Sequence, residues 1–223
     1  MGEVERVASY SARACHSHQN FNQSGKMTAK NILSVYNLAT VSDIEQGQRW
    51  YARALSFAGN LSDQYDVHIQ TIVGVIAALS PRNRWERNMQ DAESMVKVYA
   101  AGGTFDDLMQ LKVCTFKTGK AKAAKILTEN IHVRADLLAT LNGPKLQEFF
   151  NCILGDSGDV CIDGHAYSIW MGERITLANV PSIGKKLRQT IKTDYQAAAE
   201  ILGVDPHIVQ AVTWVAWRRI HEV

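Results

Sequence analysis

Apolar residues recur at every third or fourth position along almost the whole chain after Met27. This spacing is typical of amphipathic helices, whereas the alternating pattern of half-buried strands is scarce. The stretch VHIQTIVGVIAAL (67–79) is apolar nearly all round, which predicts a helix at the centre of a core. The sequence therefore predicts an all-α fold of many short helices joined by tight turns.

Residues that begin and end helices support this interpretation. Ser80-Pro81 ends the buried helix, because the residue before a proline avoids the helical region. Asp163 has the position of an N-cap for a helix that continues to about Met171. We therefore expect Asp163 at the beginning of a helix.

The first 26 residues differ in composition from the rest. They are polar and lack periodicity, so we expect a flexible arm at 1–26, followed by a helical domain at 27–223. Cys15, His16 and His18 lie in this arm without an evident fourth ligand, so no metal site is predicted.

The cysteine spacing and the hydropathy of the sequence indicate the cellular compartment in which the protein is expected. None of the four cysteines forms a C-x-x-C pair, and no apolar run is long enough to cross a bilayer. We expect a reduced, intracellular protein of the cytoplasm that does not contact a membrane.

The net charge of +2 hides an uneven distribution. Basic residues gather between positions 112 and 145, opposed there by Glu129 and Asp136, and they are Lys112, Lys117, Lys120, Lys122, Lys125, Arg134 and Lys145. Such a surplus would follow a phosphate backbone. The alternative is an ordinary solvated helix face.

Lys145 and Asp163 are the candidate catalytic residues. A helix over 144–154 would be roughly 16 Å long, and an extended loop over 155–162 would span up to about 26 Å, so the chain can return and bring both side chains together. A neutral amine is a nucleophile that forms Schiff bases, and a carboxylate takes up protons or stabilises a cationic sugar. The alternative is a solvated lysine and an ordinary N-cap aspartate.

These residues carry a resemblance to the helix-hairpin-helix DNA glycosylase superfamily, of the endonuclease III and 8-oxoguanine glycosylase type. The family has a hairpin L-P-G-V-G-x-K-T-A, followed by V-D-T-H eighteen residues after the lysine, and LNGPKLQ and CIDGHAYSIW occupy these places here. The resemblance puts Lys145 on the nucleophilic lysine, Asp163 on the catalytic aspartate and His165 on the histidine that follows. It implies a helix-hairpin-helix element at about 133–154 that includes Gly143, and a cleft between two helical halves.

Two upstream stretches are similar to the same family, so that about half of the chain is covered in the right order. VGVIAALSPRNRWERNMQDAESMVKVY resembles its long buried helix, which ends in L-L-S-x-Q, and the helix that follows. The resemblance implies that Ser80, Pro81 and Arg82 probe the duplex. GKAKAAKIL, which begins one residue before Lys120, resembles the family's K-A-x-x-I helix, and on this resemblance Lys120 is a candidate for contact with DNA.

Three further residues are candidates for contact with DNA. Arg84 and Asn88 continue the stretch SPRNRWERN, for which a capped helix start with Trp85 over the core is the alternative. Gln210, with Arg218, would line the mouth of a pocket, and core packing is the alternative for that helix.

The chain departs from the family pattern at the hairpin, where Gly143-Pro144 replaces Gly-x-Gly. The family hairpin holds a DNA phosphate through backbone N–H groups, and proline has none. No cysteine follows Cys161, so an iron–sulfur cluster is not expected, and we predict no cofactor.

The resemblance implies a DNA glycosylase that flips and excises a damaged or modified base, with AP-lyase activity if Lys145 forms an imine. One alternative is an enzyme on the same fold that modifies a hypermodified pyrimidine in DNA without excising it, which the altered hairpin motivates. A second alternative is a catalytically inactive DNA-binding module.

Overall fold

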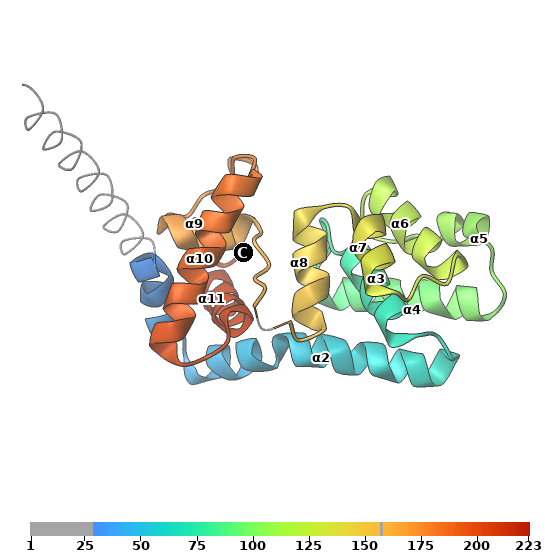
Figure 1. Ribbon diagram of the computed structural model, residues 1–223, viewed down its shortest axis with the longest axis horizontal. Coiled ribbons are helices and arrows are strands. Elements are labelled where there is room, and N and C mark those ends of the chain that lie inside the picture. Colours follow the sequence, from blue (N-terminus) through green and yellow to red (C-terminus); the bar gives the residue numbers. More distant parts are fainter. Residues whose placement is uncertain (1–28, 157) are drawn as a thin grey trace, which may run out of the picture. The chain divides into compact units, whose positions relative to one another are not determined.

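The computed structural model describes residues 29–156 and 158–223, and this part of the chain consists of helices joined by short loops (Figure 1). No strand occurs in these residues, so the predicted all-α class is confirmed. The predicted arm at 1–26, with Cys15, His16 and His18, lies outside the described residues.

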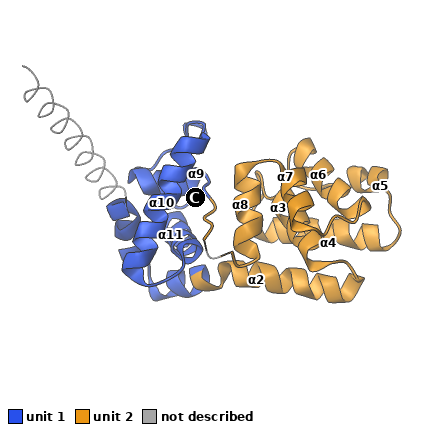
Figure 2. Ribbon diagram, in the orientation of Figure 1, with its two compact units in different colours: residues 1–47, 162–223 blue, residues 48–161 orange. Residues whose placement is uncertain are grey.

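The chain divides into two compact units, which Figure 2 draws in different colours. Unit 1 combines residues 1–47 with 162–223, and unit 2 contains residues 48–161. Helix α2 (Val41–Tyr65) contributes to both units. The helical domain expected at 27–223, with the two helical halves that the resemblance implies, stays a prediction.

Unit 2 is built around α3 (Ile69–Leu79), in which every residue from Thr71 to Leu79 is buried. This confirms the central buried helix that the sequence predicts. Around it pack α4 (Trp85–Ala100), α6 (Lys117–Thr128), α7 (Arg134–Leu141) and α8 (Pro144–Ile153). Gly74 allows close packing, because a Cβ there would lie 2.8 Å from Leu137 Cδ2.

Two lysines of α6 bind the ends of neighbouring helices in unit 2. Lys120 Nζ donates to the carbonyl oxygens of Met109 and Leu111, where α5 (Phe105–Gln110) ends. Lys122 Nζ donates to the Leu141 carbonyl oxygen at the end of α7. Because the last carbonyls of a helix have no partner within that helix, these lysines cap α5 and α7.

Unit 1 contains α9 (Gly164–Met171), α10 (Lys185–Leu202) and α11 (Pro206–His221), which contact one another. Residues 29–37 are also helical, and Asn31 Nδ2 donates to the Trp170 carbonyl oxygen at 3.0 Å. The beginning of α2 meets α11 closely at Gly47, where a Cβ would lie 2.5 Å from Val212 Cα.

The beginning of α2 is fixed by a reciprocal pair of hydrogen bonds. Asp43 N donates to Thr40 Oγ1 at 3.1 Å, and Thr40 N donates to Asp43 Oδ2 at 2.8 Å, which is the capping-box arrangement. Arg219 Nε of α11 donates to the same Asp43 oxygen at 2.8 Å. The Asp43 carboxylate thus links the beginning of α2 to α11 within unit 1.

Among the described residues, no helix combines the length and the apolar character that a membrane span requires.

Candidate functional site

The predicted hairpin region of unit 2 contains two helices, α7 and α8, separated by Asn142 and Gly143. Asn142 has a left-handed backbone with φ 37°, and Gly143 is the extended N-cap of α8. Pro144 occupies the first helical position, where its missing N–H is not needed. Lys145 therefore lies in the first turn of α8, as expected.

The Lys145 side chain is half-buried, and within the described residues its amine makes no hydrogen bond or ion pair. Lys120 and Lys122, by contrast, are bound to carbonyl oxygens. The backbone carbonyl of Lys145 accepts a weak hydrogen bond from Cys161 Sγ at 3.9 Å. The amine of Lys145 is thus not used to hold the fold.

Asp163 is the N-cap of α9 in unit 1, as the sequence predicts. Its Oδ1 accepts a hydrogen bond from Ala166 N at 2.9 Å. The preceding residue is held as well, because Arg188 Nη1 donates to the Ile162 carbonyl oxygen at 2.9 Å. The carboxylate is half-buried at the positive end of the α9 dipole, which favours a negative charge.

Tyr195 lies fully buried close to this helix start. Its hydroxyl donates to the Ala166 carbonyl oxygen at 3.5 Å. Burial raises the pKa of Tyr195 well above its ordinary value; a hydrogen bond with Thr213 opposes this, and the negative charge of Asp163 adds to it. The phenol stays neutral at physiological pH, so Asp163 has an uncharged neighbour on this side.

His165 and Gln210 also belong to unit 1. The His165 ring meets Trp214 edge-on with 6.2 Å between ring centres, and the guanidinium carbon of Arg218 lies 4.6 Å from the centre of the Trp214 ring. Gln210 is buried on α11, with 5% of its surface exposed. The predicted contacts of His165 and Gln210 with a substrate stay predictions.

The predicted site residues come from both units. Lys145 and Gly143 belong to unit 2, whereas Asp163 belongs to unit 1. The approach of Lys145 to Asp163, and the cleft that the resemblance implies, therefore stay predictions.

The loop between α3 and α4 and the first turn of α4 contain four predicted DNA contacts of two kinds. Ser80 Oγ donates to the Ala77 carbonyl oxygen at 2.9 Å, and the buried Asn88 donates through Nδ2 to the Ile76 carbonyl oxygen at 3.1 Å. Both side chains therefore bind the end of α3. Arg82 and Arg84 are exposed, and Arg82 has a left-handed backbone with φ 58°.

A second segment lies against this loop, and the sequence indicated only its two lysines, Lys112 and Lys117, as candidates for contact with a phosphate backbone. Thr115 Oγ1 donates to the Pro81 carbonyl oxygen at 3.2 Å, and Cys114 Sγ donates weakly to the Arg82 carbonyl oxygen at 3.6 Å. The Arg82 guanidinium carbon lies 4.8 Å from the centre of the Phe116 ring, and Phe116 is 46% exposed. The sequence offered one signal, an aromatic residue directly before a lysine-rich helix.

Together the two segments form an exposed surface on unit 2 that combines positive charge with an aromatic ring. We call it the basic loop surface, and it consists of Arg82, Arg84, Lys112, Phe116 and Lys117. Guanidinium groups, ammonium groups and an exposed ring are the side chains that bind phosphates and stack on bases.

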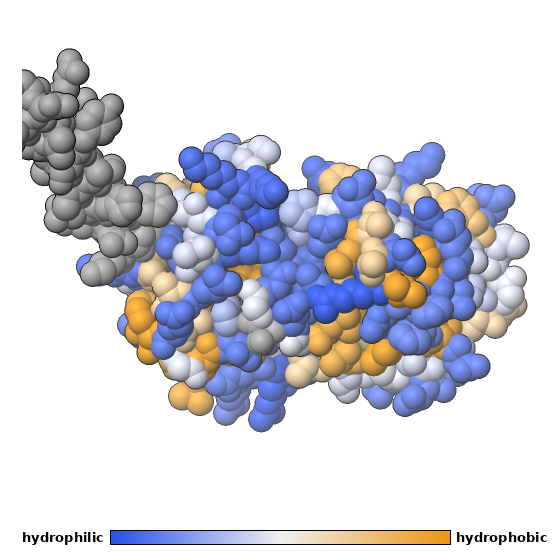
Figure 3. Space-filling view, viewed as in Figure 1, coloured by the Kyte–Doolittle hydropathy of each residue, from blue (hydrophilic) through white to orange (hydrophobic). Residues whose placement is uncertain are grey.

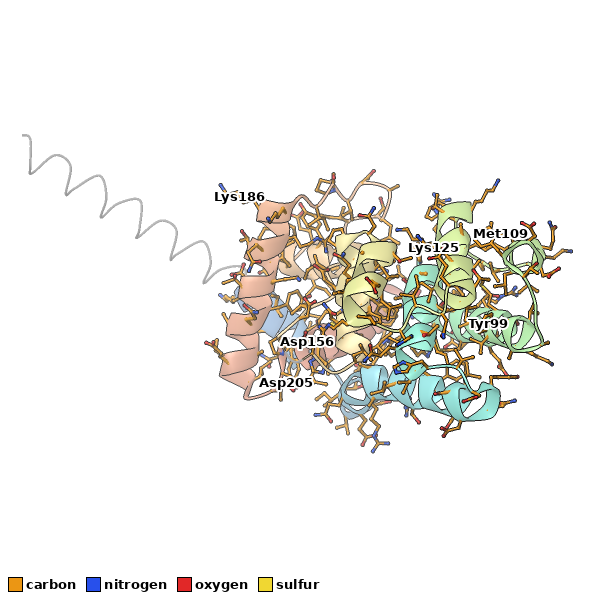
Figure 4. The ribbon with its side chains drawn as sticks, turned by 45° about the vertical axis from the view of Figure 1, so that its right-hand side comes forward. Tyr99, Met109, Lys125, Asp156, Lys186 and Asp205 are labelled. Carbon is orange, nitrogen blue, oxygen red and sulfur yellow. The ribbon has the colours of Figure 1, made fainter. Side chains whose placement is uncertain are left out.

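Other members of the basic stretch are engaged within unit 2. Arg134 Nη2 donates to Asn151 Oδ1 at 2.9 Å and to Asp156 Oδ2 at 2.6 Å. Lys125, labelled with Asp156 in Figure 4, lies 3.8 Å from Glu129 Oε2. Of the basic residues between positions 112 and 145, those without such bonds in the described residues are Lys112, Lys117 and Lys145.

A groove of unit 2 lies apart from the predicted site residues. It runs along α6 and α7, and the residues that line it include Phe105, Ala121, Lys125, Ala139 and Thr140. Figure 3 shows that the drawn face of unit 2 mixes apolar with hydrophilic side chains. The groove is lined by Lys122 and Lys125 of the basic stretch, but not by Lys145 or Asp163.

Within the described part of the chain, no group of three or more His, Cys, Asp or Glu residues is arranged to hold a metal ion. Cys114, Cys152 and Cys161 are free thiols. Burial raises the pKa of the Cys152 thiol far above its ordinary value, with a smaller contribution from the negative charge of Asp159.

Comparison with known proteins gives one match. Residues 14–221 match the model of a protein family described as a family of unknown function (DUF7178). No curated protein and no solved structure matches the chain. Since the family match spans most of the sequence, the chain belongs to the DUF7178 family of unknown function.

Proposed function

We propose that the chain is an enzyme of the DNA glycosylase type, which flips a damaged or modified base out of DNA and excises it. The observation that carries the proposal is the position of Lys145 and Asp163, each at the N-terminal end of a helix, with the Lys145 amine free of bonds within the described residues. An unengaged amine is available as a nucleophile, whereas Lys120 and Lys122 are not.

The covalent chain allows these two residues to act on one nucleotide. Cys161 Sγ lies 3.9 Å from the Lys145 carbonyl oxygen. Asp163 follows Cys161 by two residues, and consecutive Cα atoms are 3.8 Å apart, so their Cα atoms are separated by at most about 7.6 Å. The proposal requires that the side chains of Lys145 and Asp163 reach the same sugar.

In the proposed reaction, the Lys145 nitrogen donates a lone pair to C1′ of the flipped nucleotide. The glycosidic C1′–N bond breaks, and its electron pair leaves with the base, which takes up a proton. Asp163 stabilises the positive charge on the sugar and accepts the proton that the Lys145 nitrogen loses. Opening of the sugar ring gives an imine, from which β-elimination cleaves the strand.

The basic loop surface supports DNA as the substrate. Arg82, Arg84, Lys112 and Lys117 would neutralise phosphates, and the exposed Phe116 ring would stack on a base. Flipping a nucleotide needs such contacts, because the unstacked duplex must be held while the base is in the active site.

The proposal is tested with oligonucleotides that carry different lesions or modified bases, assayed for base release and strand scission. We expect the wild-type protein to release one base and Asp163→Asn to release none. Lys145→Gln should lose strand scission, whereas Lys125→Gln, a matched change of an exposed lysine in the same unit, should keep it. Release of no base from any substrate would contradict the proposal.

Mass spectrometry of the nucleosides distinguishes this proposal from the modification of a base. A free base supports excision, whereas an intact but altered nucleoside means that the enzyme modifies its substrate. Pro144 motivates this comparison, because it removes an N–H from the hairpin that holds a phosphate in the resembled family. Salt-dependent binding without either product, unchanged in Asp163→Asn, would indicate a binding module.

A further inference from the structure

Asp91 of α4 is a buried carboxylate, 3% exposed, that accepts hydrogen bonds from three residues of unit 2. Asn83 Nδ2 donates at 3.0 Å, Arg87 Nε at 2.7 Å and Cys114 N at 2.8 Å. Because all three donors converge on one carboxylate that water does not reach, its removal would leave several polar groups unpaired at once.

These donors belong to the two segments that form the basic loop surface. Asn83 directly follows Arg82, and Cys114 precedes Phe116 by two residues. Arg87 joins the segments a second time, because its Nη2 donates to the Lys112 carbonyl oxygen at 3.0 Å. Asp91 therefore holds two loops that are distant in sequence against each other.

The contacts between the two loops maintain an unusual backbone conformation at Arg82. A φ of 58° is unfavourable for a residue other than glycine and persists only where surrounding contacts enforce it. Contacts on both sides of Arg82 do so, since Thr115 binds the Pro81 carbonyl and Asp91 binds the Asn83 side chain. In this conformation the Arg82 side chain lies over Phe116.

We infer that Asp91 is a positioning residue, which holds Arg82 and Phe116 in the arrangement that contacts DNA before DNA is bound. The inference rests on the proposed function, because it concerns the same DNA. Asp91 is buried and touches no DNA itself. Because Asp91 holds the two loops in place beforehand, they need not be ordered when DNA binds. This lowers the free-energy cost of association.

The test compares DNA binding by two variants that carry the same chemical change. Asp91→Asn and Asp107→Asn both remove one negative charge from unit 2, so their general electrostatic effect on DNA is matched. Asp107 caps α5 through Thr104 and contacts neither loop. We expect Asp91→Asn to weaken binding by about tenfold, as for a member of a hydrogen-bonded network, and Asp107→Asn to leave it unchanged or slightly tighter.

A double-mutant cycle separates positioning from general destabilisation. If Asp91 acts through Arg82, then Asp91→Asn should weaken binding much less in an Arg82→Ala background than in the wild type. Equal losses in both backgrounds, or unchanged binding by Asp91→Asn, would overturn the inference. If Asp91→Asn does not fold, Asn83→Ala replaces it in the cycle, since it removes only the bond from the loop.

The same experiment distinguishes a failure of this inference from a failure of the proposed function. A wild-type protein that binds no DNA overturns both. A wild-type protein that binds DNA, with additive losses in the cycle, overturns only the role of Asp91.

Discussion

The Arg82 guanidinium carbon lies 4.8 Å from the centre of the Phe116 ring, although α4 and α5 separate the two residues in the sequence. A guanidinium over an exposed aromatic ring gives a small stabilisation to the free protein, of about 0.5–1 kcal/mol. Its main consequence is that a cation and a ring are held together on the surface of unit 2, which the proposed function would use to contact DNA.

The two partners should affect DNA binding differently. Arg82→Ala removes a phosphate contact, so binding should weaken and the slope of log affinity against log salt concentration should fall by about 1. Phe116→Ala removes stacking, so binding should weaken by about 1–3 kcal/mol without a change in that slope. Titration of labelled DNA at several salt concentrations checks both. Equal slopes for Arg82→Ala and the wild type would contradict the assigned role of Arg82.

Substitutions of two lysines at the beginning of α6 should affect different properties. Replacing Lys120 should lower the stability of the fold, and replacing Lys117 should lower the affinity for DNA. Lys120→Met leaves the carbonyls of Met109 and Leu111 without their donor, so the free energy of unfolding should fall by about 1–3 kcal/mol with little change in DNA affinity. Lys117→Met should show the reverse, because Lys117 is exposed on the basic loop surface. Urea denaturation and DNA titration measure the two effects. Loss of DNA affinity in a stable Lys120→Met variant would restore the direct DNA contact that the resemblance implies.

Two glycines of α2 should respond oppositely to alanine. At Gly47 the added Cβ would lie 2.5 Å from Val212 Cα, so Gly47→Ala should lower the free energy of unfolding by about 1–3 kcal/mol. At Gly59 the nearest atom is Ile69 Cδ1 at 3.8 Å, an ordinary contact, so Gly59→Ala should raise stability by about 0.5–1 kcal/mol. Urea unfolding of both variants provides the comparison, and a stable Gly47→Ala would show that α2 and α11 do not pack this closely.

The stability of unit 1 should depend on pH through Asp43. Burial raises the pKa of Asp43, but hydrogen bonds from Thr40 and Arg219 outweigh it, so the pKa lies below the ordinary value of 3.8. The stabilisation is therefore complete above the ordinary pKa and is lost as the pH falls through the lowered pKa of the folded protein. Unfolding of the wild type and of Asp43→Asn between pH 2 and pH 6, measured in urea, should give a difference that grows with pH and then levels off. A difference that does not vary over this window would contradict the assignment.

The parts of the fold that depend on residues close together in the sequence could be predicted. The buried helix at 69–79 follows from its composition, and the beginning of α9 follows from Asp163. The boundary between the two units at residues 47 and 48 could not be predicted, because it lies within α2, without a proline or a polar linker.

The missed part of the site depends on contacts between distant residues. Asp91 binds Cys114, 23 positions away, and no sequence motif links the two residues. The roles of Lys120 and Lys122 as caps were equally hidden, because a lysine on a helix face has the same sequence signature whether it binds a phosphate or a carbonyl. The approach of Lys145 to Asp163 is still a prediction.

The central claim is that the Lys145 amine attacks a sugar carbon in DNA, and trapping with borohydride tests it most directly. The reduced complex with DNA that carries a lesion or an abasic site would be digested, and the modified peptide sequenced by mass spectrometry. We expect a deoxyribose adduct on Lys145 in the wild type and no trapped complex in Lys145→Gln. No trapped complex with the wild type, or an adduct on a different residue that persists in Lys145→Gln, would contradict it.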